Sequence, residues 1–114
     1  CIMDLKPASP GHVLIFPKKH YSFFIELEDE LVSHLFFIVQ KISNKLLSSL
    51  GANGTTILIE NGYAAGQKAD HMLVHLIPRY ENDNLNLKLP EIEVPYEQAK
   101  KIQQLLIKEL SGKQ

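Results

Sequence analysis

Two histidines lie in one apolar segment in the second half of the chain, His71-Met72-Leu73-Val74-His75-Leu76-Ile77. If this segment is a β-strand, alternate residues point to the same face, so His71, Leu73 and His75 share one side and the residues between them face the core. At about 3.4 Å per residue the two imidazoles stand roughly 13 Å apart, too far to bind one metal ion together. We therefore expect no chelating pair on this strand, and nothing else in the sequence gives a reason to expect a metal or a cofactor. A structural explanation remains open, with one histidine bonded in the core and the other on the surface.

A loop of small residues precedes this segment, Asn61-Gly62-Tyr63-Ala64-Ala65-Gly66-Gln67, and Lys68 follows it. Glycines allow backbone N–H groups to approach an anion closely, and the Gln67 amide can donate to a phosphate oxygen. Lys68 would add a positive charge, although a solvated loop lysine is the simpler interpretation. Judged by turn chemistry alone, the loop is best explained as an ordinary β-turn.

Two helices and several short strands must position these groups. Apolar residues recur every three or four positions from about Leu27 to Leu50, which predicts an amphipathic helix that ends at Gly51. Pro95 opens a second helix. Strands are expected at 1–3, 12–16, 54–60 and 71–77, the last ended by Pro78, and a polar turn at 82–86. The pattern predicts an α+β domain with a mostly antiparallel sheet and helices on one face. The predicted helix stripes are Leu31, Val32, Leu35, Phe36, Val39, Ile42, Leu46 and Leu50 in the first, and Tyr96, Ala99, Ile102, Leu106 and Leu110 in the second.

Composition limits the class of protein. The 114 residues carry 12 basic and 13 acidic side chains, a net charge of −1, with 45% hydrophobic residues and one cysteine. The net charge near zero argues against a general nucleic-acid binder. The single cysteine argues against a disulfide framework. The apolar runs are too short to cross a bilayer. We expect one soluble, cytoplasmic domain, 1–114, with no nucleic-acid or membrane partner.

Two blocks of sequence resemble the histidine triad (HIT) superfamily. The loop from Asn61 to Gln67, followed by the segment from His71 to Arg79, is similar to the family's Gly-Gln step and its three alternating histidines. Asp4-Leu5-Lys6-Pro7 and Pro10-Gly11-His12, with the strand and Pro-Lys-Lys-His segment that follow, are similar to its earlier strand. The long helix falls between the blocks, as in the family. Strands that usually precede Cys1 are absent, so we expect the chain to begin within a longer domain.

The resemblance implies a role for each matching residue. HIT proteins bind nucleotides and act at the α-phosphate through a covalent nucleotidyl-histidine. Asp4 matches the residue that holds the ribose hydroxyls, although a turn-starting aspartate is nearly as good an explanation. The alternative explanation for His12 is a turn residue after Gly11. The other implied roles are Ile2 and Leu5 at the base, Gly66 and Gln67 near the phosphates, His75 as phosphoryl donor, His71 as buried organiser, and His12 as a supporting histidine beside His71.

The middle histidine of the triad is replaced by Leu73, which cannot attack phosphorus or transfer a proton. Three functions therefore stay open. The first is a nucleotide-binding protein for a purine mononucleotide or dinucleoside polyphosphate, without the covalent step. The second is a slow phosphoester or phosphoramidate hydrolase that uses His75 or His12 as a base toward water. The third is a dimeric interaction module with a vestigial site. Family resemblance also implies a homodimer.

Overall fold

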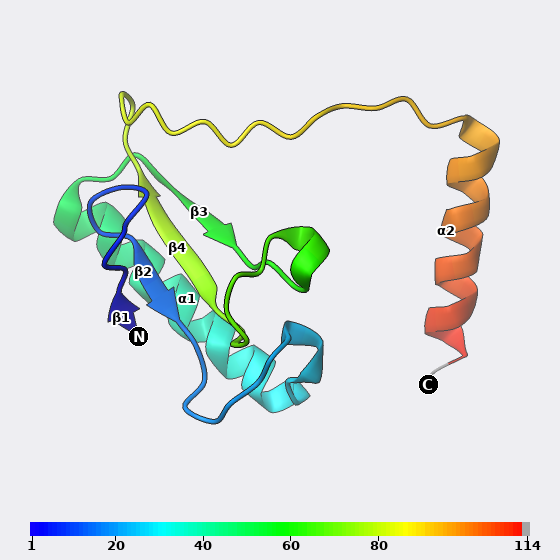
Figure 1. Ribbon diagram of the computed structural model, residues 1–114, viewed down its shortest axis with the longest axis horizontal. Coiled ribbons are helices and arrows are strands. Elements are labelled where there is room, and N and C mark those ends of the chain that lie inside the picture. Colours follow the sequence, from blue (N-terminus) through cyan, green and yellow to red (C-terminus); the bar gives the residue numbers. More distant parts are fainter. Residues whose placement is uncertain (113–114) are drawn as a thin grey trace.

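A four-stranded antiparallel sheet forms the centre of the computed structural model, which describes residues 1–112 (Figure 1). The strands lie in the order β1-β2-β4-β3, and all three pairs are antiparallel. This confirms the predicted α+β class. The strands are β1 (Ile2–Met3), β2 (Val13–Ile15), β3 (Gly54–Leu58) and β4 (Val74–Arg79).

Helix α1 (Asp29–Leu50) covers one face of this sheet (Figure 1). Its buried residues Leu35, Val39 and Leu46 join Val74 and Leu76 of β4 in the core. The helix ends at Gly51 in the left-handed conformation, with φ 68°, as the sequence predicts. Two residues of the predicted stripe lie outside the core: Phe36 is 36% exposed and Leu50 is 50% exposed.

Strand β4 begins three residues later than predicted and continues through Pro78. The expected strand end at Pro78 was wrong because pairing with β2 stops earlier, where Leu76 lies opposite Val13. Past Leu76, β4 has no strand partner on the β2 side. Pro78 has no N–H to donate, so its presence breaks no hydrogen bond of the sheet there. Ser9 occupies that side instead, and its hydroxyl donates to the Pro78 carbonyl at 2.6 Å. The 71–73 segment is therefore a connection rather than a strand.

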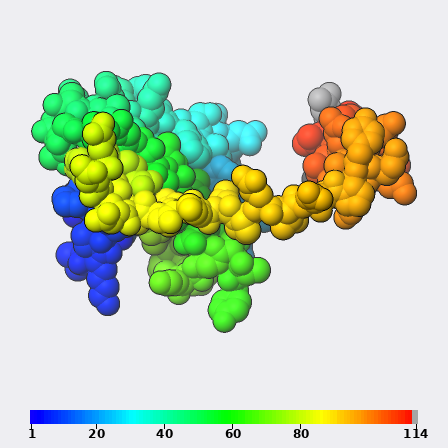
Figure 2. Space-filling view, turned by 90° about the horizontal axis from the view of Figure 1, so that it is seen from above, coloured from blue at the N-terminus to red at the C-terminus, as the bar shows by residue number. Residues whose placement is uncertain are grey.

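The final helix, α2 (Tyr96–Ser111), stands apart from the sheet and from α1 (Figures 1 and 2). Residues 80–112, here called the arm, leave the end of β4 as extended chain and end in this helix. Every residue from 86 to 112 is exposed, including the predicted apolar face of α2. The expectation that both helices cover one face of the sheet was wrong, because the arm carries α2 away from it.

Neither helix within residues 1–112 is long and apolar enough to cross a membrane. Two short 3-10 helices complete the structure, Phe24–Glu26 before α1 and Tyr63–Ala65 in the small-residue loop.

Candidate functional site

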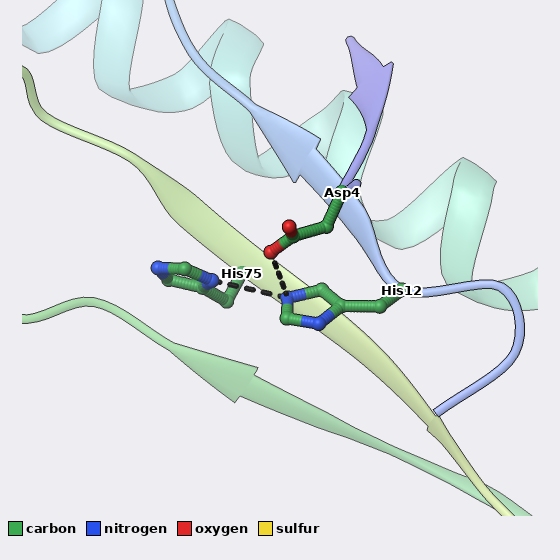
Figure 3. Close-up of side chains that lie close together, drawn as sticks. All are labelled: Asp4, His12 and His75. Carbon is green, nitrogen blue, oxygen red and sulfur yellow. Dashed lines mark hydrogen bonds and ion pairs between the residues drawn. The ribbon is translucent and has the colours of Figure 1, made fainter. Parts of the chain in front are cut away.

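Three polar side chains from three different segments meet beside the sheet (Figure 3). Asp4 follows β1, His12 precedes β2, and His75 lies on β4 opposite Leu14. Atom Nε2 of His12 lies 3.0 Å from Nδ1 of His75 and 3.6 Å from Oδ2 of Asp4. His12 is 5% exposed. Strand pairing brings these groups together, because β2 joins β1 on one side and β4 on the other.

The hydrogen bonds of His12 determine which nitrogens carry hydrogen. The amide N–H of Ala8 donates to Nδ1 of His12 at 3.0 Å, so the neutral ring carries its hydrogen on Nε2. This Nε2–H donates to Nδ1 of His75. Since Nδ1 of His75 accepts, its hydrogen is on Nε2. The far end of the His75 ring, directed away from His12 in Figure 3, is therefore a hydrogen-bond donor.

Burial keeps His12 neutral. It lowers the pKa of His12 below its usual value, the Asp4 carboxylate opposes this by raising the pKa, and His75 lowers it further. Asp4 also has a local role, since its Oδ1 accepts from the amide N–H of Lys6 at 2.9 Å. This hydrogen bond is the one that a turn-starting aspartate makes, and the second oxygen of Asp4 lies beside His12.

The same three side chains have a spacing that a metal ion requires, with ligand atoms of Asp4, His12 and His75 within 4.8 Å of one another. A metal ligand must present a free lone pair, however, and the lone pair of His12 is on Nδ1, where Ala8 occupies it. Nε2 of His12 faces the other two groups with a hydrogen attached. The arrangement therefore suits a hydrogen-bonded chain rather than a metal centre.

A cavity of about 180 Å³ lies next to this cluster. It shares His75 with the cluster and brings together most of the residues expected near the phosphates. Its size suits a phosphate group rather than a whole nucleotide, whose pockets are typically larger than about 300 Å³. Its lining residues are Glu60, Gly66, Gln67, Lys68, Ala69, His71, Leu73 and His75.

The side chain of Gln67 stabilises the loop instead of facing a ligand. Its Oε1 accepts from the amide N–H of Gly62 at 2.7 Å. Its Nε2 lies within hydrogen-bonding distance of the carbonyls of Ser22, Ala69 and His71, at 2.7, 2.9 and 3.3 Å. The expected donation from Gln67 to a phosphate was wrong in this structure, because backbone carbonyls occupy both N–H groups.

His71 and His12 differ from the roles that the resemblance implied. His71 is exposed and packs edge-on against His20, with ring centroids 4.6 Å apart. It is not a buried organiser, because the chain before Val74 has left the sheet. His12 is the buried histidine, and it supports His75 rather than His71.

Residues Ile2 and Leu5 lie near Asp4 in the chain but are 55% and 95% exposed. They remain outside the phosphate cavity. Glu60 is a cavity residue that the sequence did not single out. A Cβ built on Gly66 would lie 2.6 Å from its carboxylate Oε2, so the two residues are in close contact. The sequence feature that could have pointed to Glu60 is its position two residues after the end of β3.

Comparison with known proteins gives the family. The model of the HIT domain matches residues 1–82. A HIT-like protein of Methanocaldococcus jannaschii is 38% identical over 91 residues, which cover 80% of this chain and 70% of the relative. Adenylylsulfatase HINT3 of Arabidopsis thaliana is 41% identical over 85 residues; the match covers 75% of this chain and 43% of that protein.

Solved structures superpose with this chain over nearly its whole length. A crystal structure from Streptococcus mutans superposes with a TM-score of 0.86 at 29% identity, over 95% of this chain and 69% of that one. A histidine triad nucleotide-binding protein from Candida albicans superposes with a TM-score of 0.83 at 29% identity, over 98% and 82%. With a family match over most of its length and relatives of this similarity, the chain belongs to the HIT domain family.

Proposed function

We propose that this chain binds a purine nucleotide, a mononucleotide or a dinucleoside polyphosphate, and does not form a nucleotidyl-histidine. The observation that carries the proposal is the hydrogen-bonded chain from Ala8 through His12 to His75. It leaves the Nε2–H of His75 as a donor beside a cavity of phosphate size. A donor held in one tautomer is suited to an anionic oxygen.

The other groups fit the parts of a nucleotide. Gly66 and the exposed Lys68 line the phosphate cavity. The second oxygen of Asp4, whose side chain is 20% exposed, is available to ribose hydroxyls. Ile2 and Leu5 are exposed, lie close to Asp4 in the chain, and would pack against the base. Relatives support this class of ligand, since one is named as a nucleotide-binding protein and another as a bis(5'-adenosyl)-triphosphatase.

Leu73 argues against covalent catalysis. It lines the cavity beside His75, at the position where the resemblance expects the nucleophilic histidine, and a leucine has no group to attack phosphorus. Hydrolysis by another base is also disfavoured. His12 is buried and its free lone pair accepts from Ala8, while His75 presents a hydrogen to the cavity. Neither ring offers a lone pair to a water molecule in this tautomer.

Calorimetric titration with AMP, ADP, GMP and a dinucleoside polyphosphate tests binding. His75→Ala removes the donor, and we expect at least a tenfold weaker affinity, because a hydrogen bond to a charged group contributes about 1.5–3 kcal/mol. His34→Ala is the control, since His34 is exposed on α1. Equal affinities in the wild type and His75→Ala would contradict the site. No binding of any nucleotide by folded protein would favour an interaction module.

Restoring a nucleophile tests the assignment of Leu73. We expect Leu73→His to create or raise hydrolysis of an adenosine phosphoramidate, of adenylyl sulfate or of bis(5'-adenosyl) triphosphate. Leu73→Asn introduces a polar group of smaller nucleophilicity and serves as the control. A folded Leu73→His protein that binds nucleotide but hydrolyses none of the three would show that Leu73 is not at the nucleophile position.

A further inference from the structure

Glu60 places a carboxylate in the wall of the phosphate cavity. It lies two residues after β3, whose last residue Leu58 pairs with His75. Continued by two residues, this antiparallel register sets Glu60 opposite Leu73, and side chains of opposite residues share one face. Glu60 and Leu73 both line the cavity together with His75. Since a glutamate carboxylate is negative at neutral pH, a phosphate bound in this cavity meets a like charge.

The position of this carboxylate depends on the missing side chain of Gly66. A Cβ built on Gly66 would lie 2.6 Å from Oε2 of Glu60 and 3.3 Å from its Cδ. The first distance is too short for a real contact, so only glycine leaves the carboxylate where it lies. Gly66 and Glu60 therefore fit together as a pair, with the carboxylate against the loop that forms the cavity.

No cation of the chain neutralises this carboxylate directly. Neither ion pair within residues 1–112 includes Glu60. Lys68 lines the same cavity, but it is exposed and lies beyond ion-pair distance of Glu60. The carboxylate is half-buried, so its charge acts on whatever occupies the cavity.

The backbone of the loop offers little to offset this charge. The amide N–H groups of Ala65 and Gln67 donate to the Gly62 carbonyl at 3.1 and 3.2 Å, and that of Gly66 donates to the Tyr63 carbonyl at 3.0 Å. Carbonyls also accept from the side-chain amide of Gln67. The N–H groups of residues 65–67 are therefore already used. They do not form the nest of free amide donors that holds an anion.

The charges of the lining limit the charge of the occupant. Lys68 and Glu60 are the permanently charged side chains of the lining, and their charges cancel. His75 adds one N–H from a neutral ring. A terminal phosphate carries about two negative charges above its second pKa of about 6, whereas an esterified or bridged phosphate carries one. Charges that share a cavity of 180 Å³ lie within a Debye length of about 8 Å, so salt screens their repulsion only in part.

We propose that Glu60 selects the charge of the phosphate that enters this cavity. It admits a phosphate with one negative charge, which is esterified or bridged to a second group, and it disfavours the doubly charged terminal phosphate of a mononucleotide. The inference rests on the proposed nucleotide site and narrows its ligand. The α-phosphate of a dinucleoside polyphosphate is bridged on both sides, whereas the phosphate of AMP is terminal.

Two ligands that differ by one phosphate charge test the selection. They are AMP and its phosphate methyl ester, each titrated calorimetrically into the full chain at about pH 7.5, above the second phosphate pKa. We expect the wild type to bind the ester more tightly. Glu60→Gln keeps the size and removes the charge, and it should strengthen AMP relative to the ester by about tenfold. Glu91→Gln, on the exposed arm, removes the same charge elsewhere and should leave the ratio unchanged.

Lys68→Gln tests the opposite charge, and we expect it to weaken AMP more than the ester. A purely structural role of Glu60 would change both affinities by the same factor and leave their ratio fixed. A ratio that moves by less than about twofold in Glu60→Gln, or a wild type that prefers AMP, would overturn the charge selection while the nucleotide site stands. Failure of both ligands to bind folded wild type and folded Glu60→Gln would overturn the nucleotide site, and the charge selection with it.

Discussion

Nε2 of His12 lies 3.0 Å from Nδ1 of His75, although 63 positions separate the two residues in the chain. Antiparallel pairing of β2 with β4 brings them together, since Leu14 lies opposite His75. The bond from Ala8 to the other nitrogen of His12 fixes the direction of donation. Backbone geometry at one end of β2 therefore decides which atom His75 presents to a ligand.

Stability is expected to fall as the solution is acidified through the titration of His12. Burial lowers its pKa in the folded protein, while the unfolded chain titrates near the usual value of about 6.5. The unfolded state therefore binds a proton first, so the stabilising contribution is complete above about pH 6.5 and is lost as the pH falls through the folded pKa. Urea unfolding from about pH 7.5 to about pH 5 measures this dependence.

His12→Asn keeps an acceptor for Ala8 but removes the titrating ring, and the slope of unfolding free energy with pH should decrease. His34→Asn, at an exposed site, should leave the slope unchanged. An unaltered slope in His12→Asn would contradict the assignment of the titration to His12.

Gly66→Ala is expected to destabilise the protein by about 1–3 kcal/mol, because Gly66 has φ 94° and side chains at such conformations are strained. The added Cβ would also meet the Glu60 carboxylate at 2.6 Å. Gly54→Ala is the control, since Gly54 lies in β3 with no atom within 4 Å of an added Cβ. Urea unfolding of both variants measures the difference, and equal stabilities would contradict the prediction.

Ser9→Ala should cost about 1–3 kcal/mol, because it leaves the Pro78 carbonyl without its partner at a buried site. Ser9 is 5% exposed. Ser48→Ala removes a longer, exposed hydrogen bond of 3.4 Å to Lys45 and should change stability by little. Thermal unfolding of the two variants gives the comparison; a larger loss in Ser48→Ala would be the contrary outcome.

Asp83→Asn should loosen the start of the arm. Hydrogen bonding to Arg79 holds the pKa of Asp83 well below its usual range, so the carboxylate is charged in this contact at neutral pH. Its loss weakens two bonds to Arg79, and we expect faster amide hydrogen exchange at Tyr80 and Leu85, whose N–H groups donate to it. Glu91→Gln, at an exposed position of the arm, should leave these rates unchanged.

The local spacing of apolar residues was sufficient to predict most of the secondary structure. Three- and four-residue spacing gave α1 to within two residues of its start, and Gly51 marked its end because only a left-handed residue stops the helix there. Alternation identified Met72, Val74 and Leu76 as core, and all three are buried. These features depend on neighbours in the chain, which the sequence records directly.

Side-chain partners across the sheet were beyond reach of the sequence. The segment with His71 looked like a strand, yet it leaves the sheet and places His71 in solvent against His20. Gln67 has the right chemistry for a phosphate, but backbone carbonyls already use its N–H groups. These outcomes depend on which acceptors and neighbouring rings lie close to each side chain in the folded chain.

By itself the sequence determined the residue types of the site and the elements that carry them: a donor-rich loop, a histidine on β4, and a leucine where a nucleophile is expected. Only the tertiary structure decided that His12 supports His75 and that the arm leaves its own body. The physical reason is that hydrogen-bond direction and the course of the arm depend on contacts between segments that are distant in the sequence, rather than on spacing along the chain.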